Sequence, residues 1–116
     1  MSFRLLLRPA AVVDLRDAWT WYEERQPGLG AEFMDAVEHK LAQVQSNPLQ
    51  FPAVHGVTRR AIVMRFPYGI FYAPRDDLIS VLAVMHHARA PLRWQRRDRD
   101  KIMFVVSVTL NSTYSP

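Results

Sequence analysis

Apolar residues recur every three or four positions through the first half of the chain, which is the spacing of an amphipathic helix. The first stripe predicts a helix from about residue 10 to residue 25, and the second predicts a helix that ends at Asn47-Pro48. The stripes consist of Val12, Leu15, Trp19 and Tyr22, and of Phe33, Val37, Leu41 and Val44. Only the helix-breaking segment 26–30 separates them, so the two helices should pack as an antiparallel hairpin.

Beyond Pro52 the chain becomes rich in β-branched and aromatic residues, which favours strands. Three strands are predicted at residues 60–66, 69–73 and 78–86, and the apolar run 3–7 predicts another at the N-terminus. Tight reversals at 67–68 and 75–77 should connect the three later strands as an antiparallel meander. The order β-α-α-β-β-β defines a small α+β domain whose helical hairpin covers one face of the sheet, while the other face is partly open.

The length of the chain limits the number of domains, and the distribution of its charges indicates which partners it could bind. A chain of 116 residues can bury one core, so we expect a single domain over residues 1–97. Residues 1–50 carry five Lys or Arg against seven Asp or Glu, whereas residues 51–116 carry ten against four. Thirteen of the fifteen cations are arginine, which favours bidentate contact with carboxylates or phosphates. Acidic protein and nucleic acid are therefore both plausible partners.

Several kinds of chemistry are not expected. The chain has no cysteine, hence no disulfide and no thiolate, and its four histidines lack the spacing of zinc ligands. We therefore predict neither a metal nor a cofactor. The apolar start of the chain is too short for a signal peptide and is closed by Arg8-Pro9, and no apolar run reaches membrane-spanning length. A soluble cytoplasmic protein is expected.

Six short motifs follow one another between about Leu5 and Arg97. They are Ala18-x-x-Trp21-Tyr22-Glu23-Glu24, Pro27-Gly28-Leu29-Gly30-x-x-Phe33, Asn47-Pro48-x-x-Phe51-Pro52, Arg59-Arg60, Phe66-Pro67-Tyr68-Gly69-Ile70-Phe71-Tyr72 and His86-x-x-Arg89-x-Pro91-x-x-Trp94. In this order they resemble the RelE/ParE toxins of bacterial type II toxin–antitoxin, or plasmid stabilisation, systems. The resemblance implies the RelE/ParE-like fold. It also implies a toxin that is neutralised by a small, tightly bound antitoxin encoded beside it.

The two branches of this family differ in chemistry. RelE-like members cut messenger RNA on the ribosome, whereas ParE-like members bind and poison DNA gyrase. RNA cleavage needs a base, a phosphate-holding cation and an acid, for which the chain offers Arg65, His86 and Arg89. The RelE-like branch usually places several lysines and a C-terminal tyrosine at its site, but this chain has two lysines and no tyrosine between residues 72 and 114. We therefore favour gyrase binding over an mRNA endonuclease. A third hypothesis is an inactive remnant that only binds the antitoxin.

Some residues are candidates for contact with these partners. We expect the target to be contacted by residues of the basic half, which are Arg60, Arg89, Trp94 and Arg97. Arg89 is the strongest of these, since Pro91 stiffens the turn that holds it. Trp21 lies off the apolar stripe, so it is either half-buried against the sheet or a partner contact. With Arg60, it is expected to contact the antitoxin. Alternative structural roles remain open: His86 as a strand-end histidine, Arg59-Arg60 as solvated strand residues, and Trp19, Tyr22 and Phe33 as core.

The C-terminal segment 98–116 departs from the family pattern. Six charged residues, 96–101, lead into the apolar run 102–110, which reads as an additional strand. Such a strand should pair with a sheet edge of its own chain, of a second copy as a homodimer, or with the antitoxin. The alternative is a tail without a selected role.

Overall fold

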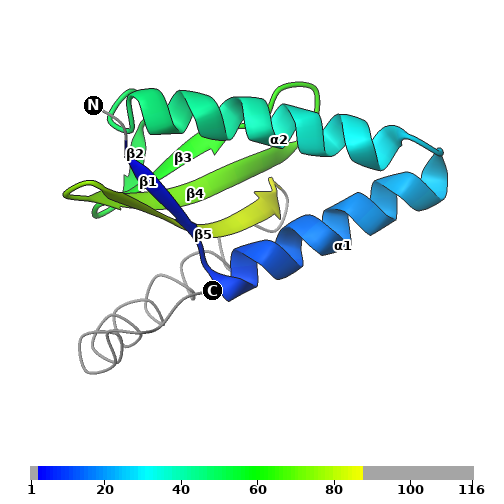
Figure 1. Ribbon diagram of the computed structural model, residues 1–116, viewed down its shortest axis with the longest axis horizontal. Coiled ribbons are helices and arrows are strands. Elements are labelled where there is room, and N and C mark those ends of the chain that lie inside the picture. The colour runs from blue at the N-terminus through cyan, green and yellow to red at the C-terminus, as the bar shows by residue number, and fades with distance from the viewer. Residues whose placement is uncertain (1–2, 88–116) are drawn as a thin grey trace.

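The computed structural model describes residues 3–87 as two helices packed on a five-stranded sheet (Figure 1). The elements are β1 (Arg4–Leu7), α1 (Pro9–Arg25), α2 (Leu29–Ser46), β2 (Ala53–His55), β3 (Thr58–Ile62), β4 (Tyr68–Arg75) and β5 (Leu78–His86). The strands lie in the order β1-β5-β4-β3-β2. The proposed boundary at residue 97 and the strand at 102–110 lie outside the described residues.

The predicted α+β architecture is confirmed, including the helical hairpin and the antiparallel meander of β3, β4 and β5. Two features were not predicted. β2 is an additional short strand, and β1 pairs with β5 in parallel, so the sheet is mixed. β3 also ends at Ile62 instead of residue 66. The chain turns there, because Arg65 adopts a left-handed conformation with φ of 70° that a strand cannot contain.

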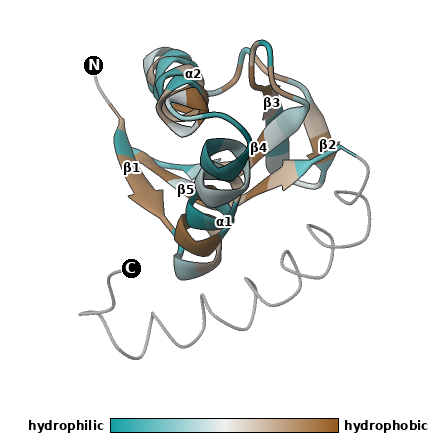
Figure 2. Ribbon diagram, turned by 90° about the vertical axis from the view of Figure 1, so that its right-hand side faces the viewer, coloured by the Kyte–Doolittle hydropathy of each residue, from teal (hydrophilic) through white to brown (hydrophobic). Residues whose placement is uncertain are grey.

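The face of α1 that packs on the protein differs from the predicted stripe. Ala11, Leu15 and Ala18 are buried, whereas the side chains of Val12 and Trp19 are 37% and 40% exposed. The expectation that Trp19 belongs to the core was therefore wrong. Small alanines on the packed face allow α1 to approach its neighbours closely. Figure 2 shows both helices banded with hydrophilic and hydrophobic residues, as amphipathic helices require.

Trp19 packs at the hairpin turn. A Cβ atom at Gly30 would lie only 2.7 Å from the indole nitrogen of Trp19, so the close approach of the two helices requires a glycine at this position. Gly28, the residue before α2, has a φ of 91°, which also favours glycine. In the helix-breaking segment 26–30, Gly30 is therefore required by a tight contact and Gly28 by its left-handed backbone conformation.

An aromatic cluster joins the helices to the sheet. Tyr22 of α1 and Phe33 of α2 meet Phe66 and Tyr68, which flank the start of β4. Ring centroids lie 5.0 Å apart for Tyr22 and Phe66, 5.3 Å for Phe33 and Phe66, and 5.2 Å for Phe33 and Tyr68. Phe33 is fully buried and Tyr22 packs against the same core, which confirms the predicted packing role of both. Each such aromatic pair contributes about 0.5–1.5 kcal/mol beyond its buried area.

β5 contains one extra residue relative to β4. Tyr72 pairs with Val81 and Phe71 pairs with Ala83, which leaves Leu82 as a β-bulge between the two pairs. Because side chains alternate between the faces of a strand, an inserted residue reverses the alternation beyond it.

The bulge decides which residues of β5 face the helices. Ile79 and Val81 before it, and Val84 after it, pack in the main core with α1 and α2. Met85 instead packs on the opposite face of the sheet. His86, two residues after Val84, is thereby turned to the side of α1.

The loop between α2 and β2 is fixed by two side chains of the sheet. The hydroxyl of Tyr72 donates a hydrogen bond of 2.6 Å to the carbonyl of Pro48, and the guanidinium of Arg59 donates to the carbonyls of Leu49 and Phe51. Burial raises the pKa of Tyr72 to about 12, although nearby Arg59 acts in the opposite direction. Arg59 is therefore engaged in the fold, and Arg59 and Arg60 are not merely a solvated pair.

Candidate functional site

A groove with a volume of about 620 Å³ runs between α1 and the ends of β4 and β5, and we call it the α1 groove. Five of its residues come from α1 and five from the strand ends. They are Asp14, Asp17, Ala18, Trp21 and Tyr22, and Pro67, Tyr68, Val84, Met85 and His86. Two residues singled out from sequence, Trp21 and His86, thus share one groove.

The α1 side of this groove is acidic. Asp14, Asp17 and Trp21 are spaced three and four residues apart, which places them on one face of the helix. Asp14 accepts a hydrogen bond of 2.9 Å from the backbone N–H of Val84. This contact satisfies an edge donor of β5 beyond the end of β1, where no neighbouring described strand supplies an acceptor. Asp17 is exposed and makes no hydrogen bond or ion pair within residues 3–87.

Aromatic rings form the other walls. Trp21 is 48% exposed and meets Tyr22 edge-on at 5.1 Å, while Tyr68 meets the His86 ring edge-on at 5.5 Å. Burial, and secondarily the neighbouring Tyr68, raise the pKa of Tyr22. The guanidinium of Arg25 lies 3.3 Å from the centroid of the Trp21 ring and donates to the Trp21 carbonyl. The Trp21 ring is therefore already a cation-binding surface for its own helix.

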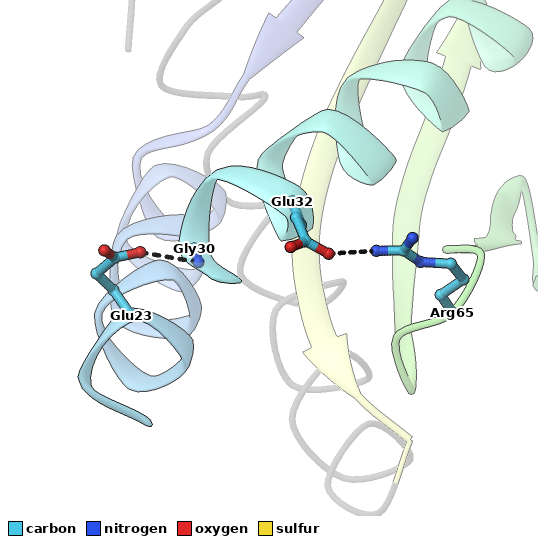
Figure 3. A network of polar contacts seen from close by, with 4 residues as sticks. All are labelled: Glu23, Gly30, Glu32 and Arg65. Carbon is cyan, nitrogen blue, oxygen red and sulfur yellow. Dashed lines mark hydrogen bonds and ion pairs between the residues drawn. The ribbon is translucent and has the colours of Figure 1, made fainter. Parts of the chain in front are cut away.

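A second, smaller groove of about 310 Å³ lies beside α2, and we call it the α2 groove. It is lined by Glu32, Asp35, Ala36, His39, Met64 and Arg65. The guanidinium of Arg65 donates to the carboxylate of Glu32 at 2.9 Å (Figure 3). Both side chains are more than half exposed, and such surface ion pairs contribute only about 0–1 kcal/mol.

A further carboxylate, Glu23, holds the turn between the helices. It accepts a hydrogen bond of 2.9 Å from the backbone N–H of Gly28. Figure 3 shows its second hydrogen bond, which it accepts from the backbone N–H of Gly30 at 3.0 Å. The first N–H groups of a helix have no partner within the helix, and the helix dipole favours a negative charge beside them. Glu23 of α1 therefore caps α2, and this helix start is occupied by the chain itself.

The described residues do not bring the proposed RNA-cleaving residues together. Arg65 lines the α2 groove, where Glu32 neutralises it, whereas His86 lines the α1 groove. Arg89 lies outside the described residues, as do the proposed target contacts Trp94 and Arg97.

The two residues proposed to contact the antitoxin lie on opposite sides of the sheet. Trp21 projects from α1, whereas Arg60 lies on the face away from the helices, where a Cβ atom at Gly69 would be 3.2 Å from the Arg60 Cγ atom. The Nε atom of Arg60 is buried and has no hydrogen-bond partner among residues 3–87. A single antitoxin segment that contacts both residues has to pass around the edge of the sheet.

Sequence analysis did not single out Asp14, Asp17 and Tyr68 as site residues. The spacing of the two aspartates to Trp21 was nevertheless a signal that all three residues share a helix face. Tyr68 was assigned to a turn, and its place in the groove depends on the pairing of β4 with β5, which no local pattern specifies.

Within residues 3–87, no three His, Cys, Asp or Glu side chains are close enough together to hold a metal ion. Neither of the helices in this range is long and apolar enough to cross a membrane.

Two solved structures share this arrangement of elements. The chromosomal ParDE toxin–antitoxin system from P. aeruginosa superimposes with a TM-score of 0.65 at 16% identity, covering 72% of this chain and 95% of that one. The E. coli toxin RelE, as a mutant in the free state, superimposes with a TM-score of 0.67 at 18% identity, covering 88% and 99%. The predicted RelE/ParE-like fold is thus confirmed. No curated protein sequence matches the chain significantly.

The amino-acid sequence, compared with models of protein families, assigns the chain to one family. Residues 5–91 match the family described as the ParE toxin of the type II toxin–antitoxin system parDE. This match covers most of the chain, and the chain therefore belongs to the ParE toxin family. A type II toxin of this kind implies an antitoxin as its partner.

Proposed function

We propose that this protein inhibits growth by binding and poisoning DNA gyrase, and that a cognate antitoxin neutralises it. The observation that carries the proposal is the match of residues 5–91 to the ParE family. The separation of Arg65 and His86 into two grooves supports it, because RNA cleavage needs its cation and its base at one phosphate. Gyrase is a cytoplasmic target, so the protein would act in the cytoplasm.

The alternative is a ribosome-dependent mRNA endonuclease. The likeness to E. coli RelE, which extends over 88% of the chain, favours it, although structural similarity at 18% identity carries the fold and not the chemistry. In this alternative Arg65, His86 and Arg89 would have to converge on the RNA. Arg65 would first have to leave Glu32.

Two assays with the purified full chain separate these functions. Inhibition of gyrase supercoiling, without cleavage of translated message on ribosomes, is the expected result. Message cleavage without any effect on gyrase would overturn the proposal in favour of the endonuclease. If induced expression leaves growth unchanged and both assays are negative, the chain is an inactive remnant that retains only antitoxin binding.

Arg89 is proposed to contact the target, and Arg89→Ala tests this role. The variant should lose growth inhibition while its thermal midpoint stays unchanged, because Arg89 is proposed to contact the target and not the core, and a substitution outside the core usually changes stability by less than about 0.5 kcal/mol. Arg75→Ala, at an exposed arginine at the end of β4, is the matched control and should remain toxic. A toxic Arg89→Ala variant would contradict the assignment.

For the antitoxin, we propose that an extended or helical segment lies across the hairpin and the open sheet face, with contacts to Trp21 and Arg60. Alanine variants of both residues should weaken the complex, and unchanged affinity in both would exclude this surface. A homodimer through residues 102–110 is a separate proposal. Truncation after Lys101, followed by light scattering, tests it: the same number of chains per particle for the full and the truncated protein would contradict the dimer.

A further inference from the structure

We propose that the α1 groove receives an arginine side chain of the antitoxin. This inference rests on the proposed neutralisation by an antitoxin and specifies the chemistry of that contact. It starts from an imbalance of charge: two aspartates line the groove, and its lining within the described residues contains neither lysine nor arginine. A groove of this composition attracts a cation and repels a phosphate.

The two aspartates, Asp14 and Asp17, differ in whether their carboxylates are engaged within the fold. Asp14 is committed to the fold, since it accepts the N–H of Val84 at 2.9 Å. Asp17, one helical turn further along the same face, has no partner within residues 3–87. Asp17 is exposed at the rim of the groove, so its carboxylate is accessible to a charge-assisted hydrogen bond from a partner.

The aromatic walls favour arginine over lysine. A guanidinium is planar, stacks on aromatic rings and presents a fork of donors to a carboxylate, whereas an ammonium is a compact and strongly hydrated charge. Trp21, Tyr22 and Tyr68 line the groove beside Asp17. The Trp21 ring already stacks on the guanidinium of Arg25, 3.3 Å from its centroid, so Tyr22 and Tyr68 are the rings of the groove without such a contact to Arg25. A volume of about 620 Å³ lies within the range of about 300–1,000 Å³ that is usual for ligand sites, and it holds one arginine with its neighbours in a peptide.

Other occupants fit less well. Nucleic acid would bring phosphates to the two carboxylates, so the groove is unsuited to an RNA or DNA target. A second copy of this chain could also contribute an arginine, since the chain has thirteen, and this occupant is distinguished by the titration below. The proposed neutralisation supplies the antitoxin as the partner, and a single arginine of an antitoxin segment satisfies the charge of Asp17.

The test uses the purified full chain and a defined probe, the capped peptide Ac-Ala-Arg-Ala-NH₂. Its citrulline analogue is nearly isosteric but uncharged, and serves as the control ligand. In ¹⁵N-resolved NMR titrations the arginine peptide should shift the Trp21 indole signal and the amides of β5 in a saturable way. Its affinity should fall at least fivefold in Asp17→Asn, fall again as salt is raised, and stay within twofold in Asp35→Asn. Asp35 is the matched control because it is an exposed aspartate that lines the other groove.

Several outcomes would overturn the inference. The first is equal affinity for the citrulline peptide and the arginine peptide. The second is an equal loss of affinity in Asp17→Asn and Asp35→Asn, and the third is tighter binding of a lysine peptide. The fourth is the absence of any saturable shift. Concentration-dependent shifts of the same signals without peptide would assign the groove to a second copy instead. Growth inhibition is not part of this test, so peptide binding by a non-toxic protein would overturn only the proposed function. A toxic protein without peptide binding would overturn only this inference.

Discussion

The grooves on the two sides of the helical hairpin differ in how their charges are compensated. In the α2 groove, the carboxylate of Glu32 is paired with Arg65 of the same chain at 2.9 Å. In the α1 groove, Asp14 is bound to the backbone of β5, and Asp17 has no partner within the described residues. The carboxylate of Glu32 in the α2 groove is therefore already paired within the chain, whereas the carboxylate of Asp17 in the α1 groove is available to another molecule.

The exposure of an acidic residue alone therefore does not show whether its carboxylate is paired within the chain. Asp17 and Glu32 are both exposed residues on helices, and the sequence gives no reason to distinguish them. What separates them is the opposite wall of each groove: a turn that carries an arginine faces Glu32, and aromatic rings lie beside Asp17. The comparison therefore predicts unequal effects for equal substitutions.

The largest effect is expected from charge reversal. Asp17→Lys should weaken antitoxin binding about 100-fold, because a like charge would meet the incoming arginine, and each tenfold step corresponds to about 1.4 kcal/mol. Asp35→Lys, in the α2 groove, should change the affinity less than about threefold. Calorimetric titration of both purified variants with the antitoxin measures this directly. Similar losses in the two variants would remove the distinction between the grooves.

Asp14 and Glu32 should differ in their contribution to stability. Asp14→Ala should lower the free energy of unfolding by about 1–3 kcal/mol, because it leaves the Val84 N–H without its acceptor. Glu32→Ala should change it by less than about 0.5 kcal/mol, since its ion pair with Arg65 is exposed. Urea unfolding of both variants gives the two values. If Glu32→Ala lowers the free energy of unfolding more than Asp14→Ala does, the ion pair between Glu32 and Arg65 stabilises the fold more than its exposure suggests.

A smaller effect should appear at alkaline pH through Tyr22 in the α1 groove. Its pKa is raised above the ordinary value of 10.0, so the unfolded chain loses this proton at a lower pH than the folded protein does. The contribution of Tyr22 is therefore complete below pH 10 and is lost as the pH rises through its folded pKa. Thermal midpoints between pH 9 and pH 11 should fall more for the parent chain than for Tyr22→Phe. Parallel curves would mean that Tyr22 does not titrate differently in the fold.

The smallest effect is expected at Arg65. Arg65→Ala loses an exposed ion pair and should lower the free energy of unfolding by no more than about 0.5 kcal/mol. Arg65→Gly loses the same pair but suits the φ of 70°, so it should be at least as stable as Arg65→Ala. Chemical denaturation resolves the order of the two variants, and a less stable glycine variant would mean that the turn does not keep its left-handed residue in solution.

The sequence was a good guide wherever structure is local. Helical spacing and the 26–30 breaker predicted the hairpin, and reversals near residues 67 and 76 predicted the meander. The parallel pairing of β1 with β5 joins Arg4 to Leu78, and no local signal specifies such a distant partner. The bulge at Leu82 could not be predicted either, because residues 81–85 are all apolar and an extra residue among them does not change the hydrophobic pattern.

The candidate site was predicted only in part, for the same reason. Trp21 was recognised because it departs from the apolar stripe of its helix, and it does line the α1 groove. Its neighbours in that groove come from strands whose register the sequence does not reveal. Arg65 and His86 were grouped by chemical type, and the fold places them in different grooves because one lies in a turn beside α2 and the other follows the bulge.

The strand order has a consequence for newly made chains. β5 lies between β1 and β4, although it is the last described strand to be synthesised. About 40 residues separate the end of α2 from the end of β5, so at about 5–20 residues per second translation needs roughly 2–8 s to supply them. During this interval β1 has no neighbouring strand and the α1 groove lacks its β5 wall. A nascent chain therefore cannot present the complete groove until His86 has emerged from the ribosome.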